Sequence, residues 1–326
     1  MLVPILLFAV GLVLLIKGGD WFVDGATGIA HRFHVPELLI GATVVSIGTT
    51  LPEVMVSASA AVGGHSEIAY GNAIGSIICN TALISAITIA VRPSKVDKRT
   101  FSTPVLFFFI AAIFYSLIAV TTGEFTRPVG IALLALFVVY MTLTVVKAFR
   151  KPDDVQLETE EEEDGDKKEN PAWKDILLLV IGAALIAVGA RLLVDNGTLI
   201  AEGLGVPESV IALTFVALGT SLPELVTAIT ALAKGHSSLS LGNIVGANLF
   251  NLVLVSGLSV TLRPFEIPAG KLIGGMNAAL VIDTPLMLFV MAFMTLPALI
   301  RGKLSRTQGI VLLALYAAYC VFQFAF

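Results

Sequence analysis

The sequence predicts an all-α polytopic membrane protein with ten transmembrane helices, arranged as two inverted five-helix repeats. Three observations support this fold class. The 326 residues are 56% hydrophobic and only 13% charged, with a mean hydropathy of +0.93, which is more apolar surface than a water-soluble core can bury. Apolar runs of helix length recur along the whole chain, and the first half of the sequence repeats in the second.

Ten apolar runs are each long enough to cross a hydrocarbon core of roughly 30 Å. The first five cover about residues 2–31, 36–63, 67–91, 101–122 and 127–149, and the second five cover about 173–203, 207–233, 238–262, 277–299 and 307–326. The first run has no preceding basic residue and no A-x-A cleavage site, so we expect a retained helix and not a signal peptide. The predicted units are a first repeat (1–150), an acidic cytoplasmic linker (151–172) and a second repeat (173–326).

The polar break between the two groups carries ten acidic residues and two lysines from Asp153 to Glu169. Such a composition cannot cross a membrane and is typical of a solvated, disordered linker. A regulatory calcium-binding role is the alternative, although the segment has no spaced ligand loop with a central glycine.

The repeat has a constant offset of 171 residues from Gly18 to Pro93. IGTTLPE (47–53) aligns with LGTSLPE (218–224), and GNAIGSIICN (71–80) aligns with GNIVGANLFN (242–251). Because each half has five crossings, an odd number, the second half must enter the membrane from the opposite side. The repeats are therefore predicted to be inverted, an architecture common among secondary transporters.

The lysine and arginine distribution predicts the orientation. With the N-terminus outside, the inward loops hold fifteen of the 20 basic residues, whereas the outward loops hold only Arg127, Arg263 and Lys271. We therefore expect a multi-pass protein of the cell membrane with the N-terminus outside and the acidic linker in the cytoplasm.

A proline and a glutamate interrupt one apolar run in each half. Proline has no N–H, so Pro52 cannot bond the carbonyl of Gly48, and Pro223 cannot bond that of Gly219. Freed carbonyls are tolerated in a membrane only where they line a protein-enclosed or wet cavity. The pattern predicts two broken helices that line such a cavity.

Oxygen-bearing side chains surround both prolines: Thr49, Thr50, Glu53, Thr220, Ser221 and Glu224. The GNxxG helix that follows in each half adds amides and one hydroxyl, from Asn72, Ser76, Asn80, Asn243 and Asn251. No thiolate or imidazole occupies matching positions, and Cys79 and Cys320 form neither a disulfide framework nor a metal motif. Hard oxygen sets suit Ca²⁺, and subsets of them suit Na⁺. Two glutamates also carry two negative charges, which one divalent ion would compensate. Without that ion, the site is expected to bind other cations or protons.

Two other interpretations of these residues compete with an ion site. Proline, glycine and small residues also occur in ordinary packed transmembrane helices, but two copies with a glutamate and a GNxxG at equal spacing disfavour that reading. Asp24 and Asp195 match across the repeat as well. We expect them to anchor the interfacial end of the first helix of each half, with ion binding as the alternative.

At these motifs the chain resembles the calcium/cation antiporter superfamily, specifically the sodium/calcium exchanger family with its two alpha-repeats. The resemblance implies a ten-helix fold with four ion sites at the repeat interface. It implies that Thr49, Glu53, Thr220 and Glu224 hold Ca²⁺. For Na⁺ or the central site it implies Thr50, Ser76, Asn80, Ser221 and Asn251, with the carbonyls of Ser46 and Ala217. Ala247 stands where the first repeat has Ser76, and Asn248 is the expected substitute ligand.

The predicted function is secondary active antiport of Na⁺ for Ca²⁺ by alternating access, without a cofactor and without enzymatic activity. Ca²⁺/H⁺ antiport on the same scaffold is the alternative, with the hydroxyls of GTTLPE and GTSLPE favouring sodium. An intramembrane hydrolase is disfavoured because no activated nucleophile or metal pair is present, and a channel because paired glutamates suit occlusion. The expected partners are Ca²⁺, Na⁺ and the lipid bilayer. The sequence indicates no nucleic acid and identifies no protein partner.

Overall fold

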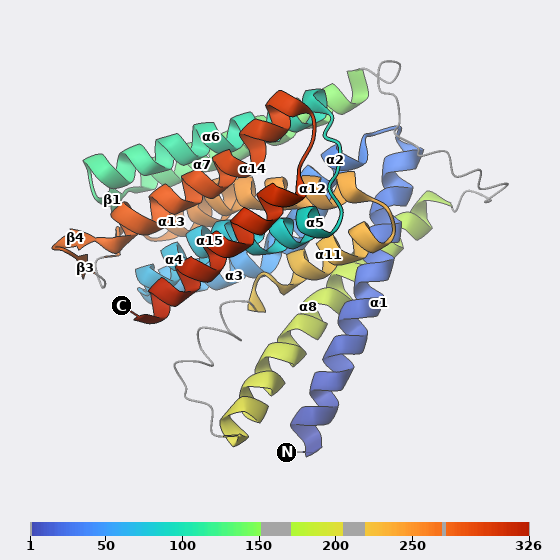
Figure 1. Ribbon diagram of the computed structural model, residues 1–326, viewed down its shortest axis with the longest axis horizontal. Coiled ribbons are helices and arrows are strands. Elements are labelled where there is room, and N and C mark those ends of the chain that lie inside the picture. Colours follow the sequence, from blue (N-terminus) through green and yellow to red (C-terminus); the bar gives the residue numbers. More distant parts are fainter. Residues whose placement is uncertain (1, 151–170, 205–218, 269–271, 326) are drawn as a thin grey trace.

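The computed structural model describes residues 2–150, 171–204, 219–268 and 272–325, and this part of the chain is almost entirely helical (Figure 1). Its helices form ten units, which confirms the predicted all-α membrane fold. Eight of these units, within the described residues, are long and apolar enough to cross a membrane. The greater part of the predicted linker lies outside the described residues.

The helical elements of the first half form five units, and η denotes a π-helical segment inside a longer helix. In chain order they are α1 (Leu2–Arg32), α2 (Glu37–Ile40), η1 (Gly41–Val45), α3 (Ser46–Gly63), α4 (Ser66–Cys79), η2 (Asn80–Ser85), α5 (Ala86–Val91), α6 (Lys98–Thr121) and α7 (Arg127–Arg150).

The second half repeats this plan. Its helical elements are α8 (Ala172–Gly203), α11 (Leu222–Ala233), α12 (Ser237–Phe250), η4 (Asn251–Ser256), α13 (Gly257–Leu262), η5 (Ala279–Asp283), α14 (Thr284–Arg301) and α15 (Arg306–Ala325). Adding 171 to the bounds of α4, η2 and α5 gives the bounds of α12, η4 and α13 to the residue. The repeat in the sequence is therefore a repeat in backbone conformation, including the position of a π-helical turn.

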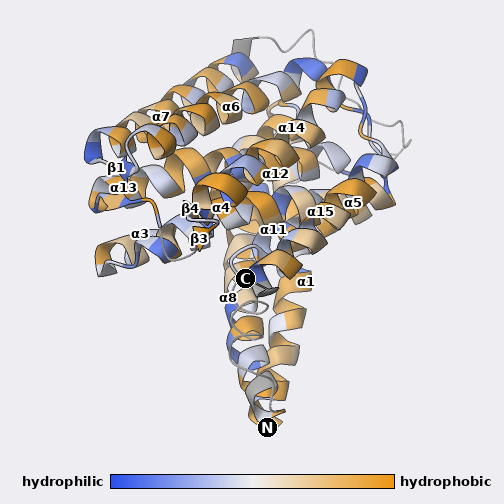
Figure 2. Cartoon of the chain, turned by 60° about the vertical axis from the view of Figure 1, so that its left-hand side comes forward, coloured by the Kyte–Doolittle hydropathy of each residue, from blue (hydrophilic) through white to orange (hydrophobic). Residues whose placement is uncertain are grey.

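The first helices of the two halves, α1 and α8, lie side by side and project from the rest of the bundle (Figures 1 and 2). They cross at reciprocal glycine pairs. A Cβ on Gly11 would lie 2.9 Å from the carbonyl oxygen of Gly189, and one on Gly18 would lie 3.0 Å from that of Gly182. Residue numbers at these contacts rise along α1 and fall along α8. The two equivalent helices are therefore antiparallel, as inverted repeats require.

The predicted helix interruption takes a different form in each half. In the second half, Thr220 and Ser221 form a turn and α11 begins at Leu222, so Pro223 lies in a first turn where its missing N–H costs nothing. In the first half the prediction of a break at Pro52 is wrong, because α3 continues through it and the irregular segment is η1, upstream. A proline removes only one helical bond, and Gly48, which loses it, lines a small cavity.

The described loop contacts fall into two separate sets, one on each face, as alternating crossings demand. On one face, strand β1 (Glu124–Phe125) pairs with β2 (Phe265–Glu266), and Arg263 donates to the Val62 carbonyl at 2.9 Å. A second short pair, β3 (Leu272–Ile273) with β4 (Met276–Asn277), lies in the loop that follows β2. On the other face, Lys95 bridges to Lys303, and His236 Nδ1 lies 2.8 Å from Glu37 Oε1.

The outer surface of the helices is apolar, as contact with lipid requires. Figure 2 shows mainly hydrophobic colours along α1 and the outer sides of α6 and α7. Leu2, Ile16 and Val138, for example, are each about 60% exposed or more in the isolated chain. In a soluble protein such a surface would be a liability, whereas in a bilayer it faces hydrocarbon.

Candidate functional site

Glu53 and Glu224 are the two glutamates of the repeated motif, and both are completely buried. Glu53 lies in the middle of α3, and Glu224 lies in the first turn of α11. None of their four carboxylate oxygens has a hydrogen-bond partner within the described structure. The two carboxylates also lie close enough to interact electrostatically.

An arrangement of this kind is unstable unless something compensates it. Removing an isolated carboxylate from water costs several kcal/mol even after the protein relaxes, and two neighbouring carboxylates repel each other as well. Within the described residues, no group of three or more Asp, Glu, His or Cys side chains forms another metal site. The two glutamates therefore need a bound cation or protons, and one divalent ion would balance both charges.

Neutral oxygen atoms of the motif lie in the same buried layer. The side chains of Ser46, Thr49, Thr50 and Ser221 are at most 2% exposed, and the hydroxyls of Thr50 and Ser221 have no hydrogen-bond partner in the described part of the chain. Thr220 is half-buried. Oxygen atoms left without a partner in a dry interior are available to coordinate a cation.

Asn80 and Asn251 occupy the same place in each half, at the first residue of η2 and of η4. Both are fully buried. Neither side-chain polar atom of Asn80 is paired, and the Oδ1 atom of Asn251 is also unpaired, while its Nδ2 donates to the Ala247 carbonyl at 3.1 Å. A π-helical turn widens the helix locally and is frequent at functional sites. The two turns thus present amide oxygens at the centre of the bundle.

Asn248, the neighbour of Ala247, has a buried side-chain amide. Its Nδ2 donates to the Thr81 hydroxyl at 2.8 Å, which leaves its buried Oδ1 without a partner. Ser76, the repeat mate of Ala247, is 5% exposed. Ala217 lies outside the described residues. The amide oxygen of Asn248 is therefore free to substitute for the hydroxyl that Ala247 lacks.

Asn72 and Asn243 join the two halves of the protein. The sequence motifs contain both residues, but the resemblance to the family did not assign them to an ion site. Thr49 Oγ1 donates to Asn243 Oδ1 at 3.1 Å, and Thr220 Oγ1 donates to Asn72 Oδ1 at 3.1 Å. These bonds are related by the 171-residue offset, so each motif threonine bonds the asparagine of the opposite half. A hydroxyl that donates to an amide keeps its lone pairs for a cation. In the sequence these asparagines stand out only as the repeated Gly-Asn dipeptide. The sequence does not show that each asparagine bonds the threonine of the opposite half.

A small cavity lies between this layer and the projecting helix pair. Its lining consists of Phe22 from α1, three residues of α8, and the motif residues of both halves: Ala183, Ile186, Ala187, Gly48, Thr49, Pro52 and Pro223. Both motif prolines line this cavity, which explains why they are tolerated in the membrane.

Asn243 provides a direct test of the cross-repeat bonds. We expect Asn243→Ala to weaken calcium binding about tenfold, because Thr49 and Ser46 lose an acceptor and the ligand layer loses its alignment. Equilibrium binding of radioactive calcium to the purified protein measures this. Asn196→Ala is the matched control, because Asn196 is a buried amide of α8 that bonds only its own helix in the described structure. Unchanged binding by Asn243→Ala would remove Asn243 from the site.

Several known proteins resemble this chain along most of its length. The model of the family described as sodium/calcium exchanger protein matches residues 3–146 and 174–325, one match for each half. The chain is 35% identical to a putative antiporter CaxA of Alkalimonas amylolytica over 98% of both chains. It is 29% identical to the sodium/calcium exchanger MaX1 of Methanosarcina acetivorans over 99% of both. A structure of the sodium-calcium exchanger NCX_Mj soaked with Na⁺ and Sr²⁺ superposes with a TM-score of 0.81 at 32% identity, covering 97% of each chain. The chain is a membrane transporter and belongs to the sodium/calcium exchanger family.

Proposed function

We propose that this cation/Ca²⁺ exchanger couples the inward movement of Na⁺ to the outward movement of Ca²⁺ by alternating access. The observation that carries the proposal is the pair of fully buried glutamates with four unpaired carboxylate oxygens. In this proposal Glu53, Glu224, Thr49 and Thr220 bind Ca²⁺. The remaining hydroxyl and amide oxygens, with the carbonyls of Ser46 and Ala217, complete the sites for Na⁺.

In this proposal, the negative charges of the two glutamates couple the movement of Na⁺ to that of Ca²⁺. Calcium and sodium compete for the same two carboxylates, so the site holds one kind of ion or the other. A site with neither ion would carry two uncompensated negative charges through hydrocarbon, which is costly. Only loaded states move between the two faces, and the protein therefore exchanges ions instead of leaking them.

The proposed orientation places the N-terminus outside and residues 151–172 in the cytoplasm. The support is the lysine and arginine distribution together with the two unmixed sets of loop contacts. One set contains Lys95 and Lys303, whereas the other contains Arg263.

The counter-ion is tested by calcium uptake into proteoliposomes. One set is loaded with sodium and diluted into sodium-free buffer, and a second set carries an acid-inside proton gradient without sodium. We expect uptake with the sodium gradient alone, because the neutral hydroxyls and amides around the glutamates are ligands that sodium needs and protons do not. Uptake driven by the proton gradient alone would show Ca²⁺/H⁺ antiport on the same scaffold.

A further inference from the structure

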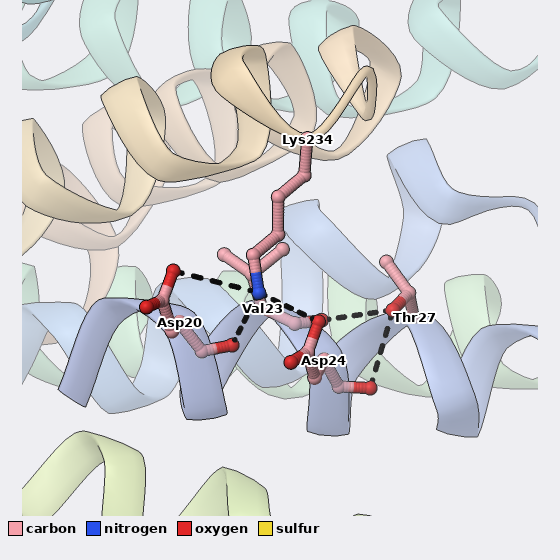
Figure 3. A network of polar contacts seen from close by, with 5 residues as sticks. All are labelled: Asp20, Val23, Asp24, Thr27 and Lys234. Carbon is pink, nitrogen blue, oxygen red and sulfur yellow. Dashed lines mark hydrogen bonds and ion pairs between the residues drawn. The ribbon is translucent and has the colours of Figure 1, made fainter. Parts of the chain in front are cut away.

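Lys234 ends α11, and oxygen atoms of α1 hold its ammonium group (Figure 3). Its Nζ lies 2.8 Å from Asp24 Oδ1 and 3.5 Å from Asp20 Oδ1, and it donates to the Asp20 carbonyl at 3.1 Å. Asp20 and Asp24 are four residues apart on one helix, so without a cation between them they would repel each other. We call this three-residue cluster the α1–α11 tie.

The tie is continuous with the packing around the ion site. Gly19 contacts α11 directly, since a Cβ there would lie 2.8 Å from Thr230 Oγ1. Three residues further along α1, the Phe22 ring covers Gly48, where a Cβ would lie 3.1 Å from the ring. Glu224 lies in the first turn of α11, about 15 Å along the helix axis from Lys234. α1 therefore contacts both the helix that carries Glu224, at Thr230 and Lys234, and the helix that carries Glu53, at Gly48.

The main packing partner of α1 is α8, and glycines form the close crossings between these two helices. Small apolar contacts tolerate a shift of one helix along another. The tie is more restrictive, because Asp20 and Asp24 are themselves about one turn apart, so a shift of one helical turn, about 5 Å, would leave the ammonium with at most one of its two carboxylates. Among the described contacts between α1 and α11, the ion pairs are thus the ones most sensitive to displacement.

Among the described residues, the tie is found at the first helix of the first half and has no counterpart at the first helix of the second. The 171-residue offset places Arg191 at the position of Asp20, Asp195 at that of Asp24, and Gly63 at that of Lys234. In α8, Arg191 lies 3.6 Å from Asp195 within the same helix, and both side chains are exposed. The second half thus neutralises its own aspartate and makes no corresponding tie. Asp24 anchors α1 to α11, as expected of it, whereas the ion pair described for Asp195 lies within α8.

We propose that Lys234 is a positioning residue whose ion pairs favour the access state in which α1 lies against α11. An ideal inverted repeat would weight its two access states equally, and a tie in one half breaks that balance. The inference rests on the proposed alternating access, which supplies the two states. The half-saturating calcium concentration at each face depends on the population of the state open to it. The ratio of the two half-saturating concentrations therefore reports the relative populations of the two access states.

The first test measures calcium exchange from each face of oriented proteoliposomes. We expect Lys234→Gln and Asp24→Asn to change the ratio of the two half-saturating concentrations roughly three- to tenfold, as expected for partly exposed charge-assisted bonds. Lys234→Arg should keep the wild-type ratio, because it preserves the charge. Arg191→Gln is the control, because Arg191 is the repeat equivalent of Asp20 but takes no part in the tie. This variant should also keep the wild-type ratio. A constant ratio in Lys234→Gln, or an equal change in Arg191→Gln, would overturn the proposal.

A second readout does not depend on transport. Spin labels on His31→Cys in α1 and Arg99→Cys in α6, both exposed positions, report the distance between α1 and the bundle in a Cys79→Ala/Cys320→Ala background. We expect Lys234→Gln to add a second distance population that Lys234→Arg lacks. An unchanged distribution would refute the tie. A second population in a protein that moves no calcium would support the tie and refute the proposed function instead.

Discussion

Glu53→Gln and Glu224→Gln are each expected to abolish calcium exchange while the protein still folds. Glutamine preserves the shape of the side chain but removes the charge that binds a divalent ion, so binding should fall at least about 100-fold. Folding should survive, because each change removes one of two buried charges that repel each other. Isotope uptake and a thermal unfolding curve measure the two effects separately.

The control for this experiment is Glu124→Gln, which changes an exposed glutamate of β1 and should leave exchange intact. A stronger form of the test compares stability with and without calcium. Wild-type protein should gain stability as calcium saturates the site, by linkage, whereas neither glutamine variant should. Normal exchange by either variant would show that its carboxylate is not a ligand.

Gly242→Ala is expected to destabilise the protein strongly and to stop transport. A Cβ at Gly242 would meet the Leu38 carbonyl oxygen and would lie 2.9 Å from the Leu38 Cα. These are backbone atoms, which cannot rotate away, so α2 and α12 must separate. Overpacking of this kind costs about 1–3 kcal/mol or more. The separation would also pull Ser46 and Thr49 away from Asn243, which follows Gly242 directly.

The repeat provides the matched control. Gly71 is the mate of Gly242, but it is exposed, and no described atom lies within 4 Å of the Cβ it would carry. We expect Gly71→Ala to melt near the wild-type temperature and Gly242→Ala to melt roughly 5 °C lower or more. Equal melting temperatures for the two variants would contradict the close crossing of α2 and α12.

The sequence predicted those features that depend on local pattern. Hydropathy located the crossings, and the 171-residue offset predicted that α4–α5 and α12–α13 would have equal bounds. The motif glutamates are buried and unpaired, a geometry that favours the site proposed for them. These features are set by composition and chain order, so no tertiary information was needed.

Other features depend on contacts between distant segments and were not predictable from one sequence. Thr49 and Asn243 are far apart in the chain, and only the folded bundle shows that they bond. The continuation of α3 through Pro52 also differs from the break that the local sequence predicts. Lys234 resembled an ordinary loop lysine until the fold placed Asp20 and Asp24 beside it.

The proposed calcium site requires Glu53 and Glu224 to share one divalent cation. Anomalous diffraction from crystals soaked with Sr²⁺ tests it most directly. We predict one strong strontium peak between the two carboxylates, with oxygen ligands near the distances of about 2.3–2.6 Å that Ca²⁺ prefers. We also predict that the peak is lost in Glu53→Gln. A saturating soak that leaves the space between Glu53 and Glu224 without a peak would show that the two carboxylates do not share a cation.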